Sequence, residues 1–397
     1  MKNNKKVILA FSGGLDTSFC AAWLNEQGFE VITVFCDTGG HTESEKKDLQ
    51  GKALALGAAR NYTIDCRRSF YDRIGACLVR CHGLYQNEYP LLCSDRYMIA
   101  EECCKIAKKE KADRIAHGCT AMGNDQVRFD VSIRTLGGFE IIAPIRDLQQ
   151  KIQTGLRSFE AEYLKDQGFP VPARQKKYTV NQNLFGVTIS GGEIDDLAEP
   201  EEDAFVMTRI RGAQRPRYVE IGFDQGRAAS LNGKRMAGHM ILDRLNRLCG
   251  PYGIGRFIYT GDCVIGIKGR IAFECPGLHA LITAHRSLSC AVLSREQNQF
   301  QTVAGEKWTG LVYSGLYFDP LREDLEKFIL SLNRFVTGKV LLKLETRRLM
   351  AVQYSSPYRI RGKGVVYAQS ATWSPSEAAG FTKLYGLAAN LAGQRKR

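Results

Sequence analysis

Short apolar runs alternate with helix-like patterns through the first part of the chain. Val7–Phe11 is a continuous apolar run and Val31–Cys36 is nearly so, which is typical of strands buried on both faces of a sheet. Between them, Thr17–Gln27 carries apolar residues at helical spacing and is followed by Gly28, a residue that commonly ends a helix. The alternation continues to Ile141–Pro144. It predicts an α/β fold in which a parallel sheet is covered by helices on both faces.

The same patterns predict the other elements of this part. Helices are expected at Lys46–Leu56, Asp95–Lys109 and Asn124–Leu136, and strands at Asn61–Asp65 and Arg114–His117. Ser94 is the expected N-cap of the helix that begins at Asp95, since its hydroxyl suits a free backbone N–H.

The pattern changes near residue 170, where Gly168–Ala173 contains two prolines. Tyr178–Ile194 is polar and rich in glycine, and we interpret it as a long functional loop. The later segments predict an α+β domain: a hairpin at Val219–Phe223 and Arg227–Leu231, helices near Met240–Leu248, Ala280–Arg295 and Asp319–Ser331, strands near Val340–Glu345 and Met350–Gln353, and a final helix at Ala378–Leu391. We therefore expect domains at 1–170 and 171–370, then a C-terminal helix and basic tail at 371–397.

The composition is that of an ordinary globular protein, with 44% apolar and 24% charged residues. No apolar run is long enough to span a membrane, and the basic Met1–Lys6 leads directly into a strand instead of a signal-peptide apolar region. The 13 cysteines form no C-x-x-C pair, so we expect reduced thiols and no metal ligands. These features predict a cytoplasmic protein with no membrane partner.

The formal net charge of +13 has two interpretations, nucleic-acid binding or an enzyme that handles small polyanions. Basic clusters such as Lys105–Lys111 and Arg347–Arg348 are short or interrupted, and no basic stripe alternates with aromatic residues. We favour the second interpretation and expect no nucleic-acid partner.

The segment Ser12–Ser18, S-G-G-L-D-T-S, lies between the first strand and the first helix. Two adjacent glycines allow a sharp turn, and the helix start adds free N–H groups to the hydroxyls of Ser12, Thr17 and Ser18. The alternative is a tight turn with an N-cap. Because all seven residues suit phosphate binding, we interpret the segment as a phosphate loop. It has no G-K-[ST], no lysine to reach the β- and γ-phosphates and no G-x-G-x-x-G, so it is neither a Walker loop nor a dinucleotide fingerprint.

This loop resembles the S-G-G-x-D-[ST]-S signature of the ATP pyrophosphatases. In that family the loop holds pyrophosphate while ATP is split between its α- and β-phosphates. The resemblance implies a substrate that is adenylylated and then attacked by a nucleophile that displaces AMP.

A second dense motif runs from His117 to Phe129. It places Asn124 and Arg128 on one face of a helix start, beside Asp125. These groups suit recognition of an amino acid, with its carboxylate on arginine and its ammonium on aspartate. The residues alone equally allow a capped helix with a surface salt bridge.

The stretch G-x-T-x-x-G-N-D-Q-V-R-F resembles the signature of the argininosuccinate synthase family, and further motifs resemble that family in order along nearly the whole chain. These motifs are Tyr89-Pro90-Leu91, Gly191-Gly192-Glu193, Tyr252–Arg256, Ile265–Lys268, Thr283–Arg286 and Gly380-Phe381. The resemblance implies an adenine nucleotide alpha hydrolase-like domain, a synthetase and multimerisation domain, and a homotetramer. It also implies that ATP, usually with Mg²⁺, activates citrulline as a citrullyl-adenylate, which aspartate converts to argininosuccinate.

Residue by residue, the resemblance assigns three groups of contacts. The ATP site comprises Ala10, Ser12, Gly13, Gly14, Asp16, Thr17, Ser18, Cys36 and Gly118. Aspartate meets Thr120, Asn124 and Asp125, and citrulline meets Tyr89, Ser94, Asn124, Arg128, Thr179 and Thr188. Asp16, Thr17, Ser18 and Asp125 are the expected catalytic residues.

Two positions depart from the family pattern. Thr260-Gly261-Asp262 stands where the family has a glutamate that holds the α-amino group of citrulline, and Phe273 stands where the family has a tyrosine. Either Asp262 replaces the glutamate as a citrulline contact, or the acceptor is an N-acylated citrulline.

Two other classes of function remain as alternatives. A tRNA-modifying adenylating enzyme of the thiolation type fits the charge and the cysteines, but such enzymes need paired catalytic cysteines or a metal cluster. A non-enzymatic nucleotide-binding or RNA-binding protein is the third, and the intact Ser12–Ser18 loop argues against it.

Overall fold

The computed structural model describes residues 5–152, 155–169, 177–210, 212 and 215–395. Their contacts divide the chain into two compact units, one that ends at Tyr358 and one that begins at Arg359. The predicted boundary at 170/171 falls on residues outside the described ranges, and the proposed division of the chain stays a prediction.

A five-stranded parallel sheet forms the first part of the larger unit, in the order β3-β2-β1-β4-β5. Its strands are β1 (Lys6–Ala10), β2 (Glu30–Asp37), β3 (Arg60–Asp65), β4 (Arg114–Ala116) and β5 (Glu140–Ile142). The helices of this part are α1 (Leu15–Glu26), α2 (Glu43–Ala55), α3 (Arg67–Phe70), α4 (Ala76–Cys81), α5 (Arg96–Glu110), α6 (Asn124–Leu136), α7 (Pro144–Gln149) and α8 (Leu156–Asp166), with one π-helix, η1 (Tyr71–Gly75). The predicted α/β class is confirmed.

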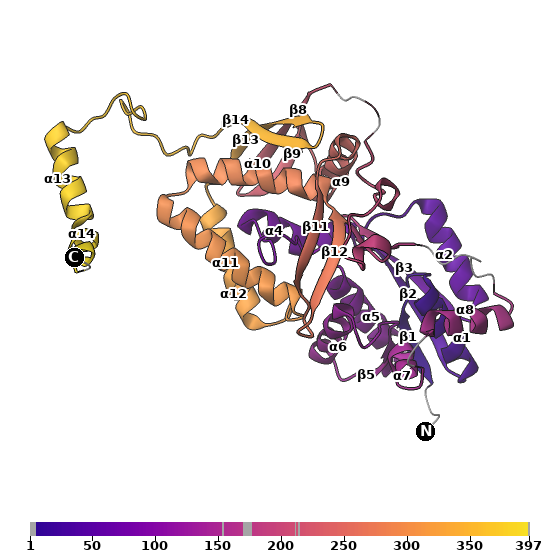
Figure 1. Ribbon diagram of the computed structural model, residues 1–397. Helices are drawn as coiled ribbons and strands as arrows, with labels where there is room; N and C mark the ends of the chain where they lie inside the picture. The colour runs from indigo at the N-terminus through magenta and orange to yellow at the C-terminus, as the bar shows by residue number, and fades with distance from the viewer. Residues whose placement is uncertain (1–4, 153–154, 170–176, 211, 213–214, 396–397) are drawn as a thin grey trace. The chain divides into compact units, whose positions relative to one another are not determined.

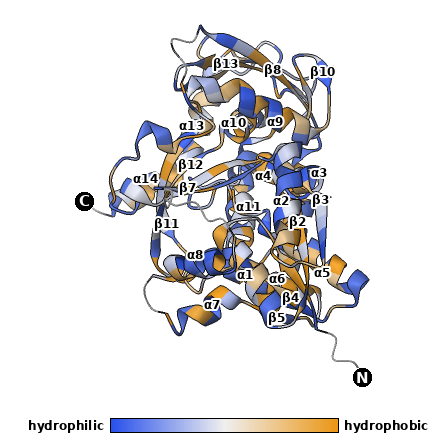
Figure 2. Ribbon diagram, turned by 90° about the vertical axis from the view of Figure 1, so that its right-hand side faces the viewer, coloured by the Kyte–Doolittle hydropathy of each residue, from blue (hydrophilic) through white to orange (hydrophobic). Residues whose placement is uncertain are grey.

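Both faces of β1 and β2 are buried, as their apolar runs predict, and helices cover the sheet (Figure 1). Val7 and Leu9 of β1 pack into one core cluster with α1, while Ile8 packs into another with α5. Successive side chains of a strand point to opposite faces, so an uninterrupted apolar run fills both cores. Figure 2 shows the resulting hydrophobic colour along β2 and β4.

The order of the strands sets the place of a ligand. The chain leaves β1 toward β2 on one side and returns to β4 on the other side. The loops after β1 and β4 therefore diverge at the carboxyl edge of the sheet, which is where ligands bind in open α/β sheets.

Two antiparallel sheets follow in the larger unit. The first has the order β11-β12-β7-β6 and the second β10-β9-β8-β13-β14. Their strands are β6 (Thr179–Asn183), β7 (Gly186–Ser190), β8 (Arg217–Asp224), β9 (Arg227–Leu231), β10 (Lys234–Arg235), β11 (Arg256–Asp262), β12 (Lys268–Glu274), β13 (Gly338–Glu345) and β14 (Arg348–Ser355). The helices are α9 (Gly238–Cys249), α10 (Pro276–Val292), α11 (Arg295–Tyr313) and α12 (Pro320–Asn333), with short 3₁₀ turns η2 (Gly192–Ile194), η3 (Glu202–Ala204) and η4 (Gly250–Tyr252).

Three local predictions are wrong. Tyr178–Ile194 is largely the β6–β7 hairpin, because β7 is paired on its other edge with β12 and is buried there. Ser94 does not cap α5: its Oγ donates to O of Leu91 at 2.7 Å, and Asp95 occupies the N-cap position. The predicted helix Ala280–Arg295 ends at Val292, and a separate helix, α11, starts three residues later.

The second unit contains α13 (Pro375–Tyr385) and α14 (Leu387–Gln394), so the single predicted final helix is interrupted at Gly386. Ser374 and Glu377 form a capping box at the start of α13. None of the residues of the two helices is buried, and Phe381 stacks on Tyr385 with ring centroids 5.2 Å apart.

Across the described ranges, no helix has both the length and the apolar character that crossing a membrane requires.

Candidate active site

The phosphate loop joins the end of β1 to the start of α1. Oγ1 of Thr17 accepts a hydrogen bond from N of Ser12 at 3.3 Å, and Oγ of Ser18 donates to O of Gly14 at 2.7 Å. Gly14 is the N-cap of α1, and no described side chain caps the helix there. The first N–H groups of α1 and the positive end of its dipole therefore form an anion site at this turn.

Gly13 gives the loop its shape. Its φ of +73° is a left-handed conformation, and a Cβ on it would lie 2.1 Å from Cδ2 of Leu49. Its carbonyl accepts a hydrogen bond from Nζ of Lys52 on α2, at 2.6 Å. The segment Ser12–Ser18 contains no lysine, but Lys52 reaches it from another helix.

Asp16 meets a second carboxyl group at the start of α1. Its charge acts on Glu160 of α8, which is only 1% exposed and whose Oε2 has no partner among the described residues. Burial and the charge of Asp16 raise the pKa of Glu160 to about 8, so the Glu160 carboxyl is protonated at neutral pH.

The other predicted ATP residues lie at the same edge of the sheet. Ala10 ends β1, Cys36 lies one residue before the end of β2, and Gly118 follows β4. A hydrogen bond with Cys66, together with burial, raises the pKa of the Cys36 thiol. A Cβ on Gly118 would lie 3.3 Å from Cγ2 of Thr17, so the loop after β4 packs against the phosphate loop.

The second motif forms a charged cluster at the start of α6. Asp125 receives hydrogen bonds from Nε of Arg96 at 3.0 Å and from a terminal nitrogen of Arg128 at 2.8 Å. Burial opposes the charge of Asp125, but the two arginines outweigh it and hold the pKa of Asp125 below its ordinary value. Nε and the other terminal nitrogen of Arg128 donate to O of Tyr313 at 3.2 and 3.0 Å, and Arg128 is 4% exposed. Thr120 lies in the loop that leads into α6.

Asn124 connects this cluster to the second part of the unit. Its Nδ2 donates to Oη of Tyr313 at 3.0 Å, and its Oδ1 accepts from N of Val264 at 2.9 Å. Oη of Tyr313 in turn donates to O of Asp262 at 2.9 Å. The predicted aspartate and citrulline contacts on α6 therefore face the end of β11.

The remaining predicted citrulline residues fall into two groups. Tyr89 is 3% exposed and meets Phe273 edge-on, with ring centroids 5.6 Å apart, and Phe273 is paired with Thr188 across β12 and β7. Tyr89, Phe273 and Thr188 therefore lie together. Ser94, 3% exposed, lies two residues before α5, and Thr179 on β6 accepts a hydrogen bond from Arg157 at 3.3 Å.

The segment that departs from the family pattern is enclosed. A Cβ on Gly261 would lie 1.9 Å from Oη of Tyr259 and 2.2 Å from Oε1 of Gln86. The carboxylate of Asp262 binds Nζ of Lys268 and accepts from Nε2 of Gln86 at 2.6 Å. Lys268, and then Gln86, hold the pKa of Asp262 below its ordinary value. A side chain at position 261 would have to displace the ends of Tyr259 and Gln86, and the neighbouring carboxylate already has a cationic partner.

Comparison with known proteins assigns the chain to a family. Residues 6–170 match the arginosuccinate synthase N-terminal HUP domain, and residues 178–392 match the arginosuccinate synthase C-terminal domain. The chain belongs to the argininosuccinate synthase family. Enzymes of this family are ligases that form a carbon–nitrogen bond.

Relatives named argininosuccinate synthase align along nearly the whole chain. The protein from Xylella fastidiosa is 48% identical over 391 residues, which cover 98% of this chain and 97% of that protein. The protein from Hyperthermus butylicus is 40% identical over 390 residues, 96% of both chains. The protein from Bacillus subtilis is 37% identical and covers 98% of this chain and 96% of its own length.

Sequence reasoning missed several residues of this synthase's candidate site. Lys52, Glu160, Arg96 and Tyr313 contact predicted site residues, yet each lies outside the two dense motifs. Only Arg96 has a sequence signal, since it lies two residues after the predicted contact Ser94.

Proposed function

We propose that this chain joins citrulline to aspartate at the edge of the parallel sheet, with ATP bound at the phosphate loop. The observation that carries the proposal is the contact between the two motifs. The loop with Gly118 packs against Thr17, so an adenylylating site and an amino-acid site are adjacent.

The first step activates citrulline. The ureido oxygen attacks the α-phosphorus of ATP, the bond to the β-phosphate breaks, and pyrophosphate leaves. N–H groups of the phosphate loop and the ammonium of Lys52 stabilise the charge that develops on pyrophosphate. In the second step the amine of aspartate forms the new C–N bond, loses a proton and displaces AMP. Asp125, Asn124 and Thr120 orient that amine.

Mg²⁺ is the expected companion of ATP. Within the described ranges, no group of three or more histidine, cysteine or acidic residues is arranged to hold a metal. This fits Mg²⁺, which usually keeps several waters and binds substrate phosphates instead of a protein cage. When bound, the ion would neutralise phosphate charge during departure of pyrophosphate.

Pyrophosphate release and oxygen transfer test the proposal. We expect release that requires both amino acids, and ¹⁸O from ureido-labelled citrulline appearing in AMP. Thr17→Val should lower the rate at least tenfold, since about 1.5 kcal/mol or more accompanies loss of a hydrogen bond to a charged group. Thr135→Val removes an exposed hydroxyl on α6 and is the matched control. Release that depends on tRNA, or unlabelled AMP, would refute the mechanism.

The residues expected to bind citrulline favour a second candidate substrate for the same reaction, an N-acylated citrulline. A side chain at Gly261 would have to displace Tyr259 and Gln86, Lys268 already pairs with Asp262, and Phe273 offers no hydroxyl. An α-ammonium group left without a carboxylate is costly, whereas an acylamino group is neutral. The test compares kcat/KM for citrulline and for N-acetylcitrulline. A clear preference for plain citrulline contradicts this candidate and leaves the main proposal intact.

We also propose that this protein is a cytoplasmic homotetramer that acts in arginine biosynthesis. The second unit supports an association through its helices, because Phe381, Leu384 and Tyr385 are each more than 60% exposed. Exposed apolar side chains gathered on short helices are typical of a contact surface for another chain.

A further inference from the structure

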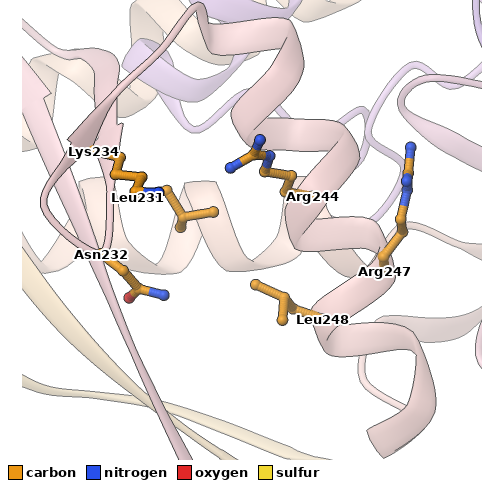
Figure 3. Close-up of a pocket in the computed structure, with 6 residues that line it drawn as sticks. All are labelled: Leu231, Asn232, Lys234, Arg244, Arg247 and Leu248. Atoms are coloured by element: carbon orange, nitrogen blue, oxygen red, sulfur yellow. The ribbon is translucent and has the colours of Figure 1, made fainter.

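Two cavities lie away from the candidate active site. One, of about 370 Å³, lies between α9 and the β9–β10 hairpin, where Leu231 and Leu248 face each other (Figure 3). Its cations, Lys234, Arg244 and Arg247, are exposed side chains that water already solvates. The other cavity, of about 350 Å³, is lined by η1, α4 and α12, and its charged side chains are buried (Arg322) or half-buried.

The charges around this second cavity do not balance. Both carboxylates of its lining are paired, Asp72 with Arg227 and Glu326 with Arg322 at 2.8 Å, and the lining residue Arg73 pairs with Glu101 outside the cavity at 2.6 Å. Arg80, on the cavity wall, has no carboxylate partner among the described residues. Its Nε donates to O of Gln225 at 3.1 Å, and its two terminal nitrogens have no described acceptor.

Arg322 adds a second unsatisfied group to the wall. It is 8% exposed, and its Nε is buried without a hydrogen-bond partner in the described part of the chain. Its guanidinium lies 4.4 Å from the ring centroid of Tyr317, and Arg73 lies 5.7 Å from the same centroid. Ile329 and Leu330 complete the lining with apolar surface.

We propose that this cavity binds a small aliphatic monocarboxylate, with its carboxylate on the terminal nitrogens of Arg80. A guanidinium binds a carboxylate through two parallel hydrogen bonds, and both donors of Arg80 are free. One unmatched cation balances one negative charge, which favours a monoanion over a phosphate. The apolar body of the ligand would lie against Ile329 and Leu330.

Burial supports this assignment independently of the geometry. It lowers the pKa of Arg80, and the nearby charge of Arg227 acts in the same direction. An anion in the cavity would offset both effects. The cavity belongs to the larger unit and shares no lining residue with the predicted ATP, aspartate or citrulline contacts.

The test uses the full chain and isovalerate as the probe, titrated by calorimetry and by saturation-transfer NMR. We expect saturable binding of isovalerate, no binding of the matched neutral amide isovaleramide, and weaker binding of inorganic phosphate. Arg80→Gln should weaken the binding of isovalerate about tenfold to a hundredfold, because the charged hydrogen bonds to its carboxylate are lost. Arg244→Gln, in the cavity of Figure 3, is the matched control and should bind as the parent chain does.

A second variant guards against misfolding at Arg80, whose backbone carbonyl accepts a hydrogen bond from Asn333 at 3.4 Å. Leu330→Trp fills the cavity from the half-exposed Leu330 while Arg80 itself is unchanged, and it should also abolish binding. The proposal is overturned if no saturable binding occurs, if the amide binds as well as the acid, if phosphate binds more tightly, or if Arg80→Gln binds normally.

Discussion

Substitution of Gly13 by alanine tests how the phosphate loop holds its shape. The change adds one methyl group where φ is +73° and where Cδ2 of Leu49 would lie 2.1 Å away. A left-handed conformation costs an alanine about 1–2 kcal/mol. Displacing Leu49 from its rotamer costs about 0.5–1.5 kcal/mol more. The sum of about 1.5–3.5 kcal/mol corresponds to about tenfold to 400-fold weaker ATP binding, since the loop must still adopt this shape to bind.

The assay is calorimetric titration of ATP into the free enzyme, with urea unfolding of the same variants. Gly51→Ala is the control, since Gly51 lies inside α2 with open space around it. It should leave ATP affinity unchanged and raise the free energy of unfolding by about 0.5–1 kcal/mol. Leu49→Ala combined with Gly13→Ala should recover the part of the loss that comes from the collision. ATP binding by Gly13→Ala within threefold of the parent, with unchanged unfolding, would refute the reasoning.

Three further predictions concern distant contacts. Burial and the charge of Asp16 raise the pKa of Glu160 from 4.5 to about 8 in the folded state. The folded state therefore holds a proton that the unfolded state loses, and the free energy of unfolding falls by ~1.4 kcal/mol per pH unit as pH rises from 4.5 to about 8. Urea unfolding at pH 5.5 and at pH 8.5 measures this decline in the free energy of unfolding, since the two pH values are spaced by about the size of the pKa shift. Glu160→Gln should remove the decline, and an unchanged decline contradicts the prediction. Tyr313→Phe should raise KM for both amino acids about tenfold, because Nδ2 of Asn124 loses its acceptor; unchanged KM values contradict this role. A chain that ends at Tyr358 should remain folded but have a lower mass by light scattering, and an unaltered mass would argue against association through the second unit.

Much of the α/β part follows from the sequence alone. The predicted strand Val7–Phe11 overlaps β1 up to Ala10, Val31–Cys36 lies within β2, and the predicted helix Asn124–Leu136 has the bounds of α6. The prediction of a phosphate loop at Ser12–Ser18 likewise comes from the sequence alone. These features are local, because apolar periodicity, paired glycines and hydroxyl groups act within a few residues of one another. A short stretch of sequence is therefore enough to recognise them.

The tertiary structure alone decided which groups complete the site. Lys52 lies 39 residues from Gly13, and Tyr313 lies 189 residues from Asn124, yet each pair shares a hydrogen bond. The polar stretch Tyr178–Ile194 became the β6–β7 hairpin only because β12 supplies an edge for β7. Such contacts depend on how helices and sheets pack. Packing brings together residues that are far apart along the chain, and no periodic pattern in the sequence identifies these pairs.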